Sequence, residues 1–172
     1  WVNYPFATSA WRTIFEKAGG MYHHMMFGPG GELGLYNAGT FYGCGFYQNN
    51  LDTGYHYITS IANLNQTEFY VDGNYVGTSN MKVTEPVEVI GNFDGNGTQP
   101  IGLIDDIAIW ERTLSFSEIQ DFMNCPPNGS ENGLVGYWNF EDNSDSLVAI
   151  DASGNGNHGV IVGAAYNNIV HF

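Results

Sequence analysis

The sequence predicts an all-β fold, an antiparallel β-sandwich with one short helix. The chain has 172 residues, and a hydrophobic content of 43% with 15% aromatics is enough to build one core. Only 13% of the residues are charged and 23 are glycine, a composition typical of short strands joined by tight turns. Apolar and β-prone residues recur over short segments, as strands require.

Short strands separated by turn residues are expected in the first third of the chain. A turn at residues 17–20 and a Gly-Pro-Gly-Gly breaker at residues 28–31 divide this region. The expected strands are residues 1–4, 11–15, 21–27 and 32–36.

The clearest hairpins come next. Residues 56–62 and 67–71 pair across a turn at residues 63–66, and Asp72-Gly73 then turns the chain into a further strand. Glycine accepts the positive φ that such a turn requires. Strands are also expected at residues 87–91 and 104–110, separated by a polar loop at residues 92–99.

One short helix is expected after these strands. Ser115 and Glu118 have the spacing of a capping box, and the prolines at residues 126–127 end the helix. Further strands are expected at residues 134–140 and 160–162.

The charge excludes several classes of partner. Eighteen acidic residues against four basic ones give a net charge of −14, which repels a phosphate backbone and an anionic membrane surface. No apolar run is long enough to span a bilayer, and no basic-then-apolar leader opens the sequence. We therefore expect no nucleic-acid partner and no membrane insertion, and a secreted or cell-surface location.

The two cysteines allow two interpretations. Cys44 and Cys125 are well separated and can form one disulfide in an oxidising compartment. They can equally remain unpaired thiols, and the sequence alone does not decide between the two.

Several motifs resemble the laminin-G-like, concanavalin-A-like jelly-roll family. TEFYVDG at residues 67–73 is similar to the family's FYVDG hairpin, and YHYI at residues 55–58 to the strand before it. LIDDIAIW at residues 103–110, followed by R-x-L-S, is similar to its final strand and helix start. GYWNFE at residues 136–141 and DASGNGNHG at residues 151–159 are similar to its first strand and the loop after it.

The order of these motifs is rotated, because the family's opening signature follows its closing one. We predict a single permuted domain over residues 1–172, with a body at 1–125 and a tail at 126–172 that supplies the first strands. The alternative is an incomplete module at 1–125 followed by the start of the next module. A tail of this size cannot normally stabilise itself, so residues 133–159 are expected beside residues 104–110 of the same chain or of a neighbouring one.

The resemblance also implies a calcium ion where the first and last strands meet. Calcium prefers carboxylate and carbonyl oxygens in turn-rich segments. The implied ligands are Asp105, Asp106, Glu141, Asp142, Asp151, Asn155 and Asn157. In the alternative interpretation, Asp151 only caps local backbone amides.

Carbohydrate recognition needs an aromatic face and a few polar groups. The ligand-binding candidates are Trp11, Tyr22, His23, Tyr42, Tyr47, Asp94 and Asn96, with Tyr4, His24, Tyr36 and Phe41 as further members of the same aromatic region. Most aromatic residues of a sandwich belong to its core, so we expect only one or two of these at a site.

The sequence thus predicts an extracellular, lectin-like binding module with structural calcium, resembling the tandem modules of bacterial surface adhesins. Its expected partner is a glycan or a surface protein. An enzyme is not expected, because the E-x-D-x-x-E pattern typical of glycoside hydrolases with this architecture is missing. The alternative is a structural spacer that assembles with neighbouring copies through strand exchange.

Overall fold

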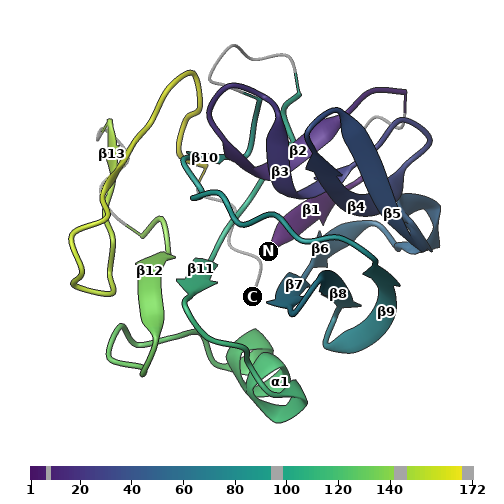
Figure 1. The fold of residues 1–172 in the computed structure, drawn as a ribbon. Coiled ribbons are helices and arrows are strands. Elements are labelled where there is room, and N and C mark those ends of the chain that lie inside the picture. Colours follow the sequence, from purple (N-terminus) through teal and green to yellow (C-terminus); the bar gives the residue numbers. More distant parts are fainter. Residues whose placement is uncertain (7–8, 94–98, 142–146, 168–172) are drawn as a thin grey trace. The chain divides into compact units, whose positions relative to one another are not determined.

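The computed structural model describes residues 1–6, 9–93, 99–141 and 147–167. Antiparallel strands and one α-helix build it, which confirms the predicted fold class (Figure 1). The chain divides into two compact units. The large unit is Val2–Leu103, and the tail unit is Trp1 with Ile104–Phe172. In the described part of the chain, no helix is long and apolar enough to cross a bilayer.

A five-stranded antiparallel sheet dominates the large unit, and its strands lie side by side in Figure 1. In order across the sheet the strands are β10 (Val89–Ile90), β2 (Arg12–Lys17), β3 (Tyr22–Phe27), β4 (Glu32–Asn37) and β5 (Thr40–Tyr47).

The two faces of this sheet differ because successive side chains of a strand point to opposite sides. One face, called the inner face, carries the deeply buried apolar residues Phe27, Leu33 and Leu35. The other, called the outer face, carries Tyr36 of β4 and Phe41 of β5, which are only half-buried. Because the apolar residues must face the core, the alternate residues of each strand lie on the outer face.

Three smaller elements complete the large unit. Strands β7 (Ile58–Asn63), β8 (Gln66–Val71) and β9 (Asn74–Ser79) form the expected meander, and β9 lies beside β5. Strand β1 (Val2–Tyr4) pairs with β6 (Gly54–His56), and η1 (Gln48–Asn50) is a single 3-10 turn.

The predicted turn between β8 and β9 is confirmed. Asp72 and Gly73 both have positive φ, at 49° and 70°. The Asp72 carboxylate also accepts the Tyr57 N–H at 2.9 Å and contacts His56 Nδ1 at 2.7 Å, so the turn is anchored to the preceding strands.

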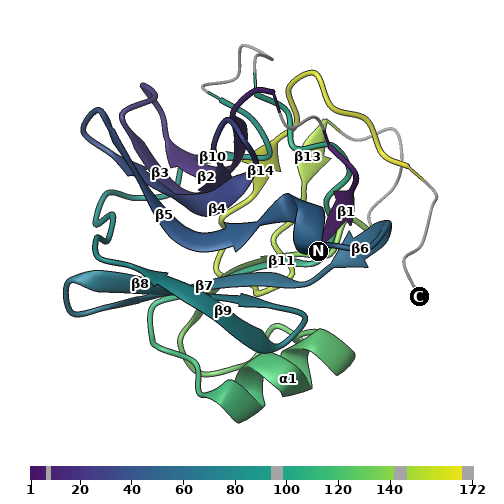
Figure 2. The same ribbon diagram turned by 90° about the vertical axis from the view of Figure 1, so that its right-hand side faces the viewer.

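The tail unit contains the helix and four short strands, and Figure 2 shows the helix in full. Strand β11 (Ile107–Trp110) pairs with β12 (Leu134–Trp138), and β13 (Val148–Ala149) with β14 (Gly159–Val160). Helix α1 (Phe116–Asn124) begins with the predicted capping box, in which the Ser115 hydroxyl accepts the Glu118 N–H and Glu118 accepts the Ser115 N–H.

The pairing of β11 with β12 joins the two ends of the rotated order within one chain. Ile107 lies opposite Trp138, and Ile109 opposite Gly136. The expected juxtaposition of residues 133–159 with residues 104–110 is therefore present. A single permuted domain, as opposed to two adjoining partial modules, stays a prediction.

Several predicted boundaries were wrong, for identifiable reasons. Strand β11 begins at Ile107 and not at residue 104, because Asp106 has a left-handed φ of 47°. Strand β12 ends at Trp138 and not at residue 140, because Phe140 has a φ of 53°. The last strand is Gly159–Val160 and not residues 160–162. The sequence placed Cys44 in a strand but gave no bounds for it, because TFYGCGFY interrupts the apolar pattern with two glycines.

Candidate functional site

A single row of side chains crosses the outer face of the five-stranded sheet. Residues opposite each other in an antiparallel pair point to the same side. From β10 to β5, the row is Val89, Glu16, His23, Tyr36 and Phe41. The β2 end of the row is polar and the β5 end is aromatic, so the outer face has two distinct halves.

The polar half is covered. Thr13 and Glu16 are 0% exposed and His23 is 2% exposed. The ring of Phe93 stacks on the His23 ring, with 5.9 Å between centroids and 13° between planes. This half therefore cannot contact a ligand directly. It supports the side chains of the neighbouring aromatic half.

The buried polar side chains form a connected network. The Thr13 hydroxyl donates to Gln99 Oε1 at 2.8 Å, so its oxygen can only accept from His23 Nδ1, which lies 3.1 Å away. The same nitrogen lies 3.2 Å from Glu16 Oε2. Burial lowers the pKa of His23, and the Gly20 carbonyl partly opposes that shift.

Phe93 and Gln99, the residues that contact this half, are both tied to Asn92. Asn92 Oδ1 accepts the N–H groups of Phe93 and Gln99 at 2.8 and 3.0 Å, which closes the loop at its base. The backbone N–H of Thr13 donates to the Gln99 carbonyl at 3.2 Å. The candidates Asp94 and Asn96 belong to this loop but lie outside the described residues.

The aromatic half of the outer face is open. Trp11, Tyr36 and Phe41 are half-buried, and the Trp11 ring meets the other two edge to face at 5.7 and 5.5 Å. Tyr36 also contacts the His23 ring at 5.6 Å, so the buried network supports the open cluster. We call Trp11, Tyr36 and Phe41 the aromatic cluster.

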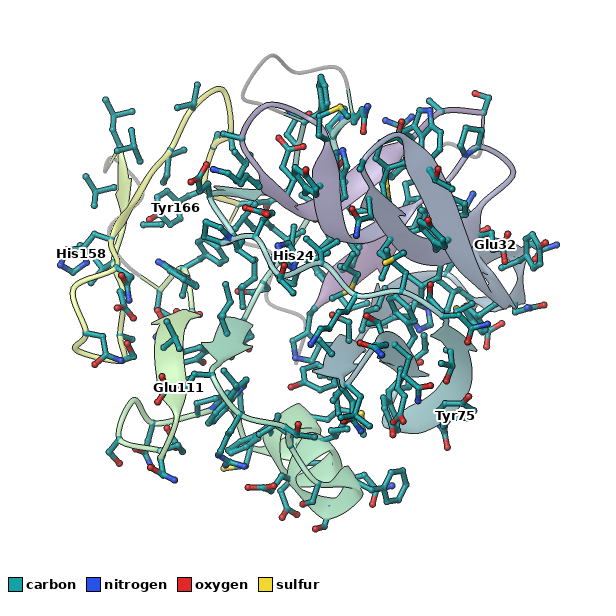
Figure 3. All side chains as sticks on the ribbon, in the orientation of Figure 1. His24, Glu32, Tyr75, Glu111, His158 and Tyr166 are labelled. Atoms are coloured by element: carbon teal, nitrogen blue, oxygen red, sulfur yellow. The ribbon has the colours of Figure 1, made fainter. Side chains whose placement is uncertain are left out.

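Beneath the aromatic cluster the sheet carries glycines, so only backbone atoms lie there. A Cβ atom on Gly34 would come within 2.9 Å of the Phe41 ring, and one on Gly43 would collide with the Glu32 carboxylate. Both side chains thus lie flat against the sheet. Glu32 Oε1 accepts the Gly45 N–H at 2.9 Å, and Figure 3 labels Glu32 near the end of β5. The open half therefore combines aromatic rings with a carboxylate at one end.

The structure brings together only part of the predicted ligand-binding set. Trp11 and His23 join the outer face, His23 as a buried support. Tyr22 and Tyr42 directly precede and follow outer-face residues, so their side chains point to the opposite face. Tyr47 lies at the end of β5 opposite Glu32 and is exposed.

The sequence analysis missed Thr13, Glu16 and Gln99. Glu16 stands in β2 among β-prone residues, where a surface position is the ordinary expectation for a carboxylate. Its side chain lies beside His23 of the neighbouring strand, and no local pattern in β2 signals that contact.

In the predicted calcium set, Asp151 has a different role. Its Oδ1 accepts the N–H groups of Tyr137 and Ser153 at 3.0 and 2.9 Å, and its Oδ2 accepts the Asn157 N–H at 2.9 Å. Burial alone would raise the pKa of Asp151, but the Ser153 hydroxyl and these N–H groups outweigh it and lower the pKa. Asp151 therefore caps backbone amides, as in the alternative interpretation.

The asparagine side chains of the same loop also form hydrogen bonds with backbone groups. Asn155 Nδ2 donates to the Leu134 carbonyl at 2.8 Å, and Asn157 Nδ2 donates to the Val135 carbonyl at 2.8 Å. The side chains of this loop thus hydrogen-bond to the backbone of β12, where a further strand would otherwise pair. These bonds use the Nδ2 atoms, whereas an amide binds a metal through Oδ1, so the metal role of Asp151, Asn155 and Asn157 stays a prediction.

The remaining predicted metal ligands are placed at one end of the β11–β12 pair. Asp105 and Asp106 precede β11 and Glu141 follows β12, and antiparallel pairing brings those two ends together. Asp106 Oδ1 accepts the Tyr137 hydroxyl, and burial together with this carboxylate raises the pKa of Tyr137. Asp142 lies outside the described residues. Within the described ranges, no group of three or more His, Cys, Asp or Glu side chains is arranged to hold a metal ion.

The two cysteines are free thiols in this structure. Cys44 is half-buried on β5 of the large unit, and Cys125 is exposed after helix α1 of the tail unit. A disulfide between them stays a prediction.

A β-sandwich with an aromatic outer sheet face defines a lectin-like class of fold. Comparison with known proteins agrees. Residues 1–120 match the model of a laminin-G family described as the concanavalin A-like lectin/glucanases superfamily. The chain belongs to this family. No curated protein matches the chain.

Two solved structures are similar to the chain. One is a candidate carbohydrate-binding protein from Bacteroides ovatus, with a TM-score of 0.68 and 18% identity over 96% of this chain and 52% of that one. The chain thus spans about half the length of that protein, and the likeness shows a shared fold. The other is an S-layer domain-containing protein from Clostridium thermocellum, with 17% identity, coverage of 72% and 70%, and a TM-score of 0.32, which supports no conclusion.

Proposed function

We propose that the chain is a carbohydrate-binding module and that the aromatic cluster contacts the sugar. The observation that carries the proposal is the open half of the outer face, where Trp11, Tyr36 and Phe41 lie together beside the Glu32 carboxylate. Aromatic rings pack on the apolar face of a sugar ring, and a carboxylate accepts hydrogen bonds from its hydroxyls. The family and the similar structure support the same ligand class.

We further propose binding without turnover. Glycoside hydrolysis needs two carboxylates that both reach the substrate. Of the described residues, Glu16 and Glu32 place carboxylates on the outer face, and Glu16 is 0% exposed. Glu32 alone cannot supply an acid and a base. We also propose that the module is extracellular, either secreted or at the cell surface, because such a module would meet glycans there.

Replacing Trp11 by alanine tests the binding proposal. We expect glycan affinity to fall tenfold to a hundredfold, because truncation of a central aromatic anchor costs about 2 kcal/mol or more. A glycan array should first identify a ligand, and calorimetry should then compare the variant with the wild type.

The control is Tyr75→Ala, because Tyr75 is 56% exposed and belongs to β9, a strand of another sheet; Figure 3 labels Tyr75 apart from Glu32. It should bind like the wild type. Unchanged affinity in Trp11→Ala, with an unchanged melting temperature, would contradict the proposed site.

Calcium remains a second proposal, restricted to Asp105, Asp106 and Glu141. These residues flank one end of the β11–β12 pair. They do not form a metal-holding group by themselves, so the proposal requires further oxygen ligands, such as Asp142 or backbone carbonyls. At ten times the dissociation constant, bound calcium would stabilise the fold by about 1.4 kcal/mol. We therefore expect calcium to raise the melting temperature by about 3–6 °C.

Glu141→Gln should abolish this rise, whereas Asp121→Asn, which removes an exposed helix carboxylate, should retain it. A wild-type melting temperature that does not change when calcium is added would rule the proposal out.

A further inference from the structure

We propose that the aromatic cluster takes an amino sugar with an unacetylated, positively charged nitrogen, and that the Glu32 carboxylate binds its ammonium group. This inference names the ligand class of the site proposed above and rests on that proposed function. Its starting point is Glu32 itself, a half-buried carboxylate on the open half of the outer face, where the other large side chains are aromatic.

Glu32 and the aromatic cluster lie within reach of one ligand. Gly34 of β4 is paired with Gly43 of β5. The Phe41 ring lies over Gly34, and the Glu32 carboxylate lies over Gly43. The Cβ positions of such a pair are about 4.5–5.5 Å apart, so the ring and the carboxylate occupy neighbouring positions on the sheet. A sugar residue that packs on the ring can therefore reach the carboxylate with one substituent.

The Glu32 carboxylate is held in place and still has capacity for a ligand. Its Oε1 accepts the Gly45 N–H at 2.9 Å, in an exposed hydrogen bond. A carboxylate has two oxygens with about four acceptor positions, so one backbone donor orients the group without saturating it. Because this contact forms without a ligand, binding costs little ordering of the side chain.

No basic side chain neutralises Glu32. The described residues include all four lysines and arginines of the chain, and none of them forms an ion pair with Glu32. Lys17 and Arg112 pair with other carboxylates. The negative charge of Glu32 acts on its neighbour Cys44, where burial and this carboxylate both raise the pKa of the thiol. A ligand that brings a positive charge to Glu32 therefore gains more than a neutral one.

An ammonium group suits the surroundings of this carboxylate. Tyr47 is paired with Glu32 in the β4–β5 register, so both side chains lie on the outer face, and Tyr47 is 42% exposed. A cation is attracted to the face of an aromatic ring, and an N–H of an ammonium forms a charge-assisted hydrogen bond with a carboxylate. A sugar hydroxyl can form the hydrogen bond but brings no charge to the ring or the carboxylate.

The charge of the whole chain favours the same ligand class. A net charge of −14 attracts cations and repels sugars that carry a carboxylate or a sulfate. An acetylated amino sugar is neutral and presents an amide where the ammonium would be. The unacetylated amino sugar is therefore the class that matches both the local and the overall charge.

Three tetrasaccharides with the same β-1,4-linked glucose skeleton test the proposal, because they differ only in the group at C2. These are the glucosamine tetramer with an ammonium, cellotetraose with a hydroxyl and the N-acetylglucosamine tetramer with an acetamide. In calorimetry with the whole chain, we expect the glucosamine tetramer to bind about tenfold tighter or more than the other two. Equal affinities for the three would overturn the inference. Butylammonium, a cation without a sugar ring, should bind far more weakly, and equal binding would overturn the assignment of a sugar.

Variants then assign the contact. Glu32→Gln keeps an oxygen for the Gly45 N–H but removes the charge, so it should bind the glucosamine tetramer no better than cellotetraose. Tyr47→Ala should weaken binding of the glucosamine tetramer about two- to fivefold, the range for a cation–π contact at an exposed site. Asp52→Asn removes an exposed carboxylate elsewhere in the large unit and should keep the full preference, which excludes diffuse attraction by the net charge. Wild-type affinity for the glucosamine tetramer in Glu32→Gln would overturn the assignment.

Trp11→Ala separates this inference from the proposed function. If both hold, this variant should weaken binding of the glucosamine tetramer and of any neutral glycan that binds. Neutral-glycan binding that depends on Trp11, without a preference for the amine, would overturn only the inference. Binding of the glucosamine tetramer that depends on Glu32 but not on Trp11 would instead remove the aromatic cluster from the site.

Discussion

Replacing Asp151 by asparagine is expected to lower the free energy of unfolding by about 3 kcal/mol or more. The Asp151 carboxylate is 3% exposed and accepts three backbone N–H groups. Hydrogen bonds to a charged acceptor contribute about 1.5–3 kcal/mol each. Asparagine replaces one carboxylate oxygen with an NH₂ group, so this donor would face a backbone N–H donor that then lacks an acceptor. Urea unfolding measures the loss, and Asp121→Asn is the matched control at an exposed helix position.

The loss in Asp151→Asn should be the same in calcium and in chelator, because the donors around Asp151 are protein amides. A loss that occurs only when calcium is present would instead make Asp151 a metal ligand. This comparison separates the two interpretations of the DASGNGNHG segment more directly than calcium binding alone does.

The same contacts predict a pH dependence. The folded-state pKa of Asp151 lies below its ordinary value, which is about 4 in an unfolded chain. Its stabilisation is therefore complete above that pH and is lost as the pH falls through the folded-state pKa. The wild type should lose more stability than Asp151→Asn between about pH 5 and pH 2. Parallel pH profiles would contradict the assignment.

Replacing His23 by leucine is expected to destabilise the chain by about 3 kcal/mol or more and to weaken glycan binding as well. The change removes the imidazole nitrogen that lies 3.2 Å from the fully buried Glu16 carboxylate, and taking a polar partner from a buried group costs about 1–3 kcal/mol, and more for a charged group. It also removes the ring on which Phe93 stacks and against which Tyr36 packs. The aromatic cluster thereby loses its support.

The double variant Glu16→Leu with His23→Leu separates stability from binding. With both members apolar, no buried charge remains and most of the stability should return. Glycan affinity should stay below the wild-type value, because the edge-to-face contact with Tyr36 is still missing. If His23→Leu alone unfolds at the same urea concentration as the wild type, the buried pair does not have the role assigned to it.

The local signals of the sequence predicted most of the elements. Asp72-Gly73 marked its hairpin, and Ser115 with Glu118 marked the start of the only helix among the described residues. Both depend on contacts within a few residues, which a sequence pattern can display. The bounds of β5 were not predicted around Cys44, because Gly43 makes room for the Glu32 side chain of the neighbouring strand, a contact that no local pattern displays.

The candidate site was predicted only in part. Trp11 and His23 were named, as members of an aromatic region, but their different roles depend on which half of the outer face is covered. The predicted calcium ligands were divided for a similar reason. Asp105, Asp106 and Glu141 flank one end of the β11–β12 pair. Asp151 accepts N–H groups of Tyr137 and of its own loop, and the asparagines donate to β12. A metal role for either group stays a prediction.

The sequence by itself determined the class of this protein, an antiparallel sandwich with its family motifs in rotated order, because strand alternation, turn residues and helix caps are local properties of the chain. The tertiary structure alone decided which polar groups are accessible. Glu16 is fully buried beside His23 and Asp151 is held by the Tyr137 and Asn157 amides, whereas the side chains of the aromatic cluster stay partly exposed. Burial and hydrogen-bond partners arise from residues far apart in the chain, and they decide whether a side chain supports the fold or is available to a ligand.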